Sequence, residues 1–250
     1  MPELSSFDGC TLFYDDQGDG RPVLLLHGFV GDINIDWVRS GILDLLLDEE
    51  YRVVAYDSRG HGLSGKPHET AAYEDDALTK DAQAVLDHLR LDGVVVVGFS
   101  MGARTALHLA AIDPRVRGVV ALGVGTPAVP LDEADRSGYT SVPDAMLTDD
   151  PDAIQGDMAR SFREMADAIH ADREALAALM AARRTEISSL VGDVTVPVLV
   201  ITGADDPAGD PVALGSAFPN GRGLQTAGDH AGVKDQPDTH AAIVEFVGSL

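Results

Sequence analysis

Cysteine is almost missing from this 250-residue sequence, which has Cys10 as its single example. One cysteine excludes an internal disulfide and any metal site built from several cysteines. Cys10 stands at the start of a strand-like run that continues to Tyr14, which favours a buried structural thiol over a reactive one. The histidines do not fill the gap, because the sequence has no H-E-x-x-H pairing. We therefore expect no metal site and no internal disulfide.

Basic residues are scarce as well, since 18 lysines and arginines face 41 aspartates and glutamates. The formal net charge of −23 repels phosphate backbones and anionic lipid headgroups. The composition therefore predicts no nucleic-acid partner and no membrane-surface partner. A well-solvated acidic surface explains this charge more simply than an acidic binding face does.

The chain also lacks any apolar run of the roughly 18–20 residues that a membrane-spanning helix needs. Its first ten residues, MPELSSFDGC, show no basic region followed by an apolar stretch, so a secretory signal is not expected. These two absences predict a cytoplasmic protein.

Short apolar runs rich in β-branched residues alternate with helical patterns along much of the chain. Strands that alternate with amphipathic helices predict an α/β fold, with a mostly parallel central sheet and helices on both faces. The helical patterns cover 36–49 and 74–91. The expected strands are Cys10–Tyr14, Val23–His27, Arg52–Tyr56, Val94–Gly98, Val116–Leu122, Val198–Thr202 and Leu224–Thr226.

The alternation stops after Val124. From 126 to 190 the sequence has proline-bearing turns and Ala- and Met-rich helical segments, such as 153–168 and 172–190, and no strand pattern. We therefore expect a core domain made of 1–125 and 191–250, with 126–190 as a small helical cap or lid laid over the sheet.

One short motif points to chemistry. Four valines, Val94–Val97, are followed by Gly98-Phe99-Ser100-Met101-Gly102 and then by an Ala-rich helical pattern. Gly-x-Ser-x-Gly between a strand and a helix produces a sharp turn that exposes the serine hydroxyl at the carboxyl end of the strand. The helix that begins there directs free N–H groups toward developing negative charge. Ser100 is therefore the candidate nucleophile.

With this motif the chain resembles the α/β-hydrolase superfamily over almost its whole length. The resemblance rests on LLLHGF (Leu24–Phe29), YDSRGHGLSGKP (Tyr56–Pro67), VVGFSMG (Val96–Gly102), VLVITGADDP (Val198–Pro207) and GDH (Gly228–His230). The superfamily orders its catalytic residues as serine, acid and histidine, which implies His230 as the base. Relatives place the acid three residues after the glycine that ends the strand, which implies Asp206 over Asp205 and, more distantly, Asp210.

The same resemblance implies an oxyanion hole formed by the backbone N–H groups of Phe29 and Met101, and structural roles for His27, Asp57 and Arg59. Asp229 stands where many relatives have glycine, and either orients His230 or faces water. No cofactor is implied, because acyl transfer by a Ser-His-Asp triad requires only water.

Fold and triad leave the reaction open. We expect a carboxylesterase acting on a small-molecule ester of small to medium acyl size. A C–C bond hydrolase is an alternative on the same triad. So is a lyase, because SMGAR (Ser100–Arg104) is similar to the SMGGR of a menaquinone-pathway lyase, whose arginine binds a substrate carboxylate. A non-hydrolytic small-molecule receptor is a third possibility. Ser100 disfavours dehalogenases and epoxide hydrolases that use an aspartate nucleophile.

Overall fold

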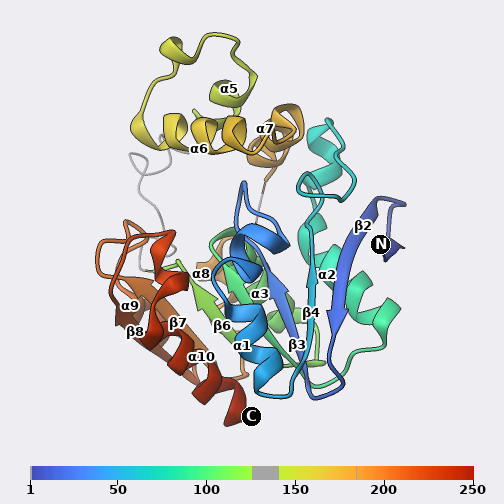
Figure 1. The fold of residues 1–250 in the computed structure, drawn as a ribbon, viewed down its shortest axis with the longest axis vertical. Helices are drawn as coiled ribbons and strands as arrows, with labels where there is room; N and C mark the ends of the chain where they lie inside the picture. The colour runs from blue at the N-terminus through green and yellow to red at the C-terminus, as the bar shows by residue number, and fades with distance from the viewer. Residues whose placement is uncertain (1, 126–140, 184) are drawn as a thin grey trace.

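The computed structural model describes residues 2–125, 141–183 and 185–250, which form one eight-stranded sheet with helices around it (Figure 1). The first three strands in space pair antiparallel, and all later pairs are parallel. In spatial order the strands are β1 (Glu3–Ser5), β2 (Thr11–Gln17), β4 (Arg52–Tyr56), β3 (Pro22–Leu26), β5 (Val94–Phe99), β6 (Val116–Leu122), β7 (Val198–Gly203) and β8 (Gly221–Thr226).

Both faces of the sheet are buried, because successive strand residues point to opposite sides and both sets are apolar. In β5, Val94 and Val96 belong to one core cluster, whereas Val95 and Val97 belong to the other. The first cluster packs against α2 (Ala77–Leu89), α3 (Met101–Ile112), α8 (Ile187–Leu190) and α9 (Pro211–Ala217). The second packs against α1 (Ile42–Asp48) and α10 (Pro237–Gly248).

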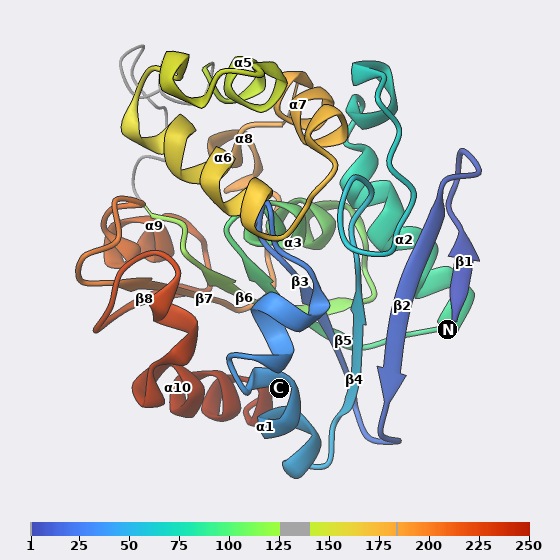
Figure 2. The ribbon, with the colours of Figure 1, turned by 45° about the horizontal axis from the view of Figure 1, so that its top comes forward.

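A third apolar cluster lies beyond one end of the sheet, where helices of the predicted insertion gather (Figure 2). It joins apolar residues of these helices to Phe29, Tyr73 and Met101 of the core. Phe162 meets Phe29 edge to face, with ring centroids 5.1 Å apart. The elements involved are α5 (Val142–Leu147), the 3₁₀ turn η4 (Pro151–Ala153), α6 (Asp157–Ala168) and α7 (Arg173–Ala181). The expected start of the insertion, 126–140, lies outside the described residues.

The predicted α/β class is confirmed, and each predicted strand is found within a few residues of its expected bounds. The expected single helix over 36–49 is wrong. Gly41, at a φ of 77°, separates the π-helix η1 (Asn34–Val38) from α1. The expected helix over 172–190 is likewise two helices, α7 and α8. Strand β1 was not predicted. Two further 3₁₀ helices within the described residues are η2 (Thr70–Tyr73) and η5 (Gly232–Asp235).

Candidate active site

Ser100 lies at the turn between β5 and α3 and has a strained backbone. Its φ of 51° and ψ of −106° place a residue with a Cβ where glycine is normally found. Such a conformation costs about 1–3 kcal/mol and persists only where the surroundings impose it. Close packing around Ser100 imposes it here. A Cβ on Gly98 would overlap the backbone of Gly102, and a Cβ on Gly102 would overlap the carbonyl of Leu26. The two glycines of the motif therefore allow the close approach of helix and strands that turns the serine outward.

The structure brings the three predicted catalytic side chains together. His230 Nε2 lies 3.1 Å from Ser100 Oγ, and its Nδ1 lies 2.9 Å and 3.1 Å from the two carboxylate oxygens of Asp206. The Asp206 side chain is fully buried, whereas the imidazole of His230 is about one-third exposed. A fixed carboxylate at Nδ1 favours the tautomer in which Nε2 accepts a proton from the serine. The arrangement has the connectivity of a nucleophile, a base and an orienting acid.

The alternative acids lie elsewhere. Asp205 is exposed, and its backbone N–H donates to the carbonyl of Gly228, which ties the β7–α9 loop to the histidine loop. Asp210 caps α9 by accepting from the N–H groups of Val212 and Ala213. Asp229 is exposed and accepts from the N–H of Gly232, so it caps the following turn.

The N–H groups of Phe29 and Met101 are both available at this end of the sheet. Met101 is the first residue of α3, where a helix leaves its N–H groups without helical acceptors. Phe29 follows β3, and within the described ranges no acceptor takes its N–H. The carbonyl of the same peptide unit, Gly28 O, accepts from His27 Nδ1 at 2.8 Å and from Gly31 N at 3.1 Å. Because a peptide unit is planar, anchoring this carbonyl also orients the Phe29 N–H.

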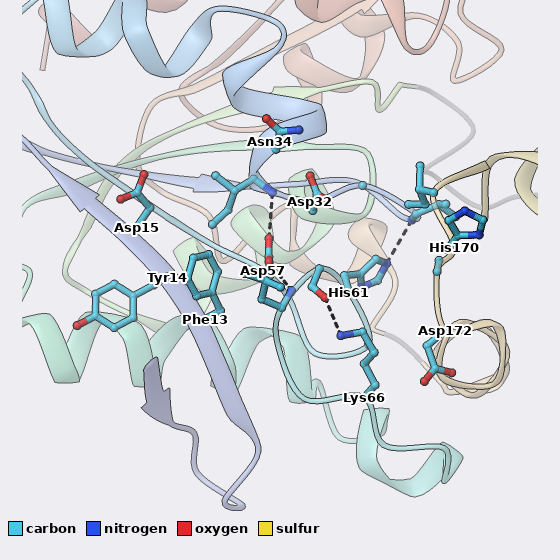
Figure 3. A pocket seen from close by; sticks show the side chains of 18 of the residues that line it. Phe13, Tyr14, Asp15, Asp32, Asn34, Asp57, His61, Lys66, His170 and Asp172 are labelled. Carbon is cyan, nitrogen blue, oxygen red and sulfur yellow. Dashed lines mark hydrogen bonds between the residues drawn. The ribbon is translucent and has the colours of Figure 1, made fainter. Parts of the chain in front are cut away.

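Two histidines cross-link the Phe29 loop to the loop after β4. His27 Nε2 accepts from Ser58 N at 2.9 Å, and His61 Nε2 accepts from Val30 N at 3.2 Å. Figure 3 shows the second of these bonds, and also the carboxylate of Asp57, which accepts from Ile33 N and Leu63 N. Burial lowers the pKa of His61 to about 3, so its ring is neutral and free to accept from Val30. These residues hold the loop that carries the Phe29 N–H.

Arg59 acts away from the three catalytic candidates. Its fully buried guanidinium pairs with Asp81, which is also fully buried, and with the partly exposed Asp8. Burial disfavours its charge, but hydrogen bonds to both carboxylates raise its pKa further above the ordinary range. The contacts bind the loop after β4 to α2 and to the chain between β1 and β2, as a structural role requires.

A cavity of about 550 Å³ lies beside the candidate site and is shown in Figure 3. Val30 and His61 form part of its wall, together with Leu63, Ile169 and Asp172. Ser100, Asp206 and His230 do not line it. The cavity is therefore lined by the residues that follow Phe29 in its loop, and it does not include the candidate nucleophile.

Asp36 and Lys234 are buried beside the site, and no motif in the sequence pointed to either of them. Asp36 Oδ2 accepts from Gly28 N at 2.8 Å, and the other carboxylate oxygen pairs with the ammonium of Lys234. The only available signal was the rarity of lysine in the chain.

Among the described residues, no group of three or more histidine, cysteine or acidic side chains could hold a metal ion. In the same part of the chain, no helix is both long and apolar enough to cross a membrane.

A family model described as alpha/beta hydrolase fold matches residues 21–206. A non-heme haloperoxidase of Rhodococcus erythropolis is 35% identical over 140 residues, covering 55% of this chain and 49% of that protein. The chain spans about half or less of the length of the first curated relatives it matches.

Two solved structures align along nearly the whole chain. The enol-lactonase from Burkholderia xenovorans LB400 has a TM-score of 0.74 and 25% identity, covering 99% of this chain and 100% of that one. An esterase from Exiguobacterium antarcticum has a TM-score of 0.78 and 20% identity, covering 99% and 97%. At 20% identity, the similarity to the esterase shows a shared fold only.

Proposed function

The chain belongs to the alpha/beta hydrolase fold family, and on that premise we propose that it is a serine hydrolase of carboxylic esters with small to medium acyl groups. The observation that carries the proposal is the continuous contact from Ser100 Oγ through His230 to the buried Asp206. A serine hydroxyl is a weak nucleophile at neutral pH and needs a positioned base. His230 is placed to act as that base.

In the proposed mechanism, Ser100 Oγ attacks the ester carbonyl while His230 Nε2 takes its proton. The tetrahedral intermediate collapses, the C–O bond to the alcohol breaks, and the proton on His230 leaves with the alcohol. Water then attacks the acyl-enzyme with His230 again as base, which releases the acid and restores the serine. Asp206 stabilises the imidazolium throughout and stays ionised.

The negative oxygen of each tetrahedral intermediate is assigned to the N–H groups of Phe29 and Met101. Removing one such donor typically costs about 3 kcal/mol of transition-state stabilisation. The hydrogen bonds that hold the Gly28 carbonyl support this assignment, since they orient one donor before substrate arrives. Preorganised donors stabilise developing charge without reorganising during the reaction.

The preference for small to medium acyl groups rests on the cap, which we assign to 126–190. Its described helices share one apolar cluster with Phe29 and Met101, the residues of the proposed oxyanion hole, and Phe162 packs against Phe29. An apolar layer this close to the reacting carbon favours a compact acyl chain over a long one. The enol-lactonase, at 25% identity, is a solved structure with this fold whose name is consistent with ester chemistry.

Release of p-nitrophenol from acetate, butyrate and octanoate esters tests the proposal. We expect turnover of all three, with acetate and butyrate faster than octanoate. A folded protein that cleaves none of them would contradict ester hydrolysis. If that protein still reacted with a fluorophosphonate at Ser100, the triad would be active, and C–C bond cleavage would replace ester hydrolysis as the proposed reaction.

A further inference from the structure

A buried ion pair joins the Phe29 loop to the histidine loop. Asp36, on η1, has a side chain that is 3% exposed, and Lys234, on η5, has one that is 8% exposed. They are 198 positions apart in the sequence. One carboxylate oxygen of Asp36 holds the ammonium of Lys234, and the other accepts from Gly28 N at 2.8 Å. Gly28 directly precedes Phe29, so two hydrogen bonds, through Asp36, connect the ammonium of Lys234 to the residue before the Phe29 N–H.

The ammonium of Lys234 also contacts the strand that carries the nucleophile. Its Nζ lies 4.0 Å from the ring centroid of Phe99, a cation–π geometry. Phe99 directly precedes Ser100, and its ring packs against the ring of His230 with centroids 5.0 Å apart. Lys234 itself lies four residues after His230, in the turn that continues the histidine loop.

We propose that Lys234 and Asp36 are positioning residues of the hydrolase, which fix the relative placement of the oxyanion donor, the nucleophile and the base. This inference rests on the proposed function. One ammonium contacts or belongs to all three segments: the Phe29 loop through Asp36, the nucleophile turn through Phe99, and the histidine loop through its own backbone. Losing it allows these segments to shift relative to one another.

The burial of the pair supports this role over simple stabilisation of the fold. Two charges taken out of water lose hydration, and a well-packed apolar pair of similar size is often at least as stabilising. In addition, the two carboxylate oxygens of Asp36 bind different partners, one the N–H of Gly28 and the other the ammonium of Lys234. Gly31 has no side chain at the point where a Cβ would overlap this carboxylate, so the loop closes tightly around it. Such specific packing sets geometry, which catalysis requires to within fractions of an ångström.

The test compares the parent with Lys234→Met and with the double variant Lys234→Met/Asp36→Asn. The single variant leaves the Asp36 charge buried without a partner, so its folding suffers. The double variant removes both charges and keeps an oxygen that accepts from Gly28 N, so it recovers most of the lost Tm. We expect kcat for p-nitrophenyl butyrate to remain roughly 10- to 100-fold below the parent in the double variant, with KM within about twofold. The rate of Ser100 labelling by a fluorophosphonate falls in parallel.

Lys80→Met is the matched control, because Lys80 also lies against an aromatic ring, that of Phe7, with its Nζ 5.3 Å from the ring centroid. It should keep the parent's kcat. A stable double variant with kcat within twofold of the parent would overturn the inference and leave the hydrolase proposal intact. A folded parent that cleaves no ester and leaves Ser100 unlabelled would instead overturn the proposed function, and the inference with it.

Discussion

His230 and Asp206 face each other across two loops, with the imidazole Nδ1 at 2.9 Å and 3.1 Å from the two carboxylate oxygens. The carboxylate is fully buried and also accepts from the N–H of Ala208 at 2.8 Å. The backbone bond from Asp205 N to Gly228 O holds the two loops together. Contacts within its own loop therefore hold the Asp206 carboxylate in place, and the carboxylate in turn orients His230.

Asp206→Asn should leave the fold intact and lower kcat roughly 10³- to 10⁴-fold, because an amide does not stabilise the imidazolium and favours the wrong tautomer. The matched control is Asp205→Asn, which makes the same chemical change at the exposed neighbour and should stay within about twofold of the parent. Initial rates on p-nitrophenyl butyrate at pH 8 measure both. The assignment of the acid would be reversed if Asp205→Asn were the inactive variant.

Stability should depend on pH through His61. Burial lowers the pKa of this histidine to about 3 in the folded protein, against about 6.5 in the unfolded chain. Between these values the unfolded state binds more protons, so the stabilisation is fully present above pH 6.5 and is lost as the pH falls toward 3. His61→Gln removes this titration while keeping an oxygen that accepts from Val30 N.

Urea unfolding at pH 7, 6, 5 and 4 measures the effect. Between pH 6 and 4 the parent should lose roughly 1 kcal/mol per pH unit more unfolding free energy than His61→Gln does. Parallel pH profiles of the two proteins would show that His61 is not a buried neutral histidine.

Arg59→Met should lower the free energy of unfolding without lowering kcat. The substitution leaves Asp81 charged and buried without its partner, which typically costs about 3–5 kcal/mol. Arg52→Met is the control, since the pair it breaks with Asp16 is partly exposed and worth roughly 0–1 kcal/mol. Thermal unfolding should separate the two variants clearly, while kcat per folded molecule stays near that of the parent in both. A selective loss of kcat in a stable Arg59→Met protein would argue for a catalytic role.

Gly102→Ala should damage both stability and activity. Its Cβ would overlap the carbonyl of Leu26, a backbone atom of a buried strand that cannot easily move, and overpacking of this kind costs about 1–3 kcal/mol. Helix α3 and the Ser100 turn would have to shift outward, so kcat should fall as well. Gly192→Ala adds the same atom where no neighbour lies within 4 Å, and should change the unfolding free energy by less than about 1 kcal/mol.

The sheet was predictable because its strands are buried on both faces and therefore read as continuous apolar runs, such as Val94–Val97. Strand β1 was missed because it is three residues long, at the edge of the sheet, with only Leu4 buried. The break at Gly41 was missed because the apolar spacing continues through it, although this glycine, at a φ of 77°, separates η1 from α1.

The candidate site was predictable where a local motif forces the geometry, as at Ser100, and where chain order alone singles out a residue, as at His230. The spacing from Gly203 that relatives use favoured Asp206 over Asp205, and of these two only Asp206 is buried and contacts His230. Asp36 and Lys234 were out of reach because their pairing links positions 198 residues apart, and neither lies in a motif. Long-range electrostatic contacts of this kind depend on the folded topology, which no local pattern encodes.

Whether Ser100 is the nucleophile is decided by p-nitrophenyl butyrate hydrolysis by the parent and by Ser100→Ala, at equal concentrations of protein shown to be folded by circular dichroism. We expect kcat to fall at least about 10³-fold, because the variant loses the nucleophile and retains only the oxyanion donors and binding. A Ser100→Ala protein that kept most of the parent's rate would contradict the assignment of Ser100 as the nucleophile, and with it the proposed mechanism.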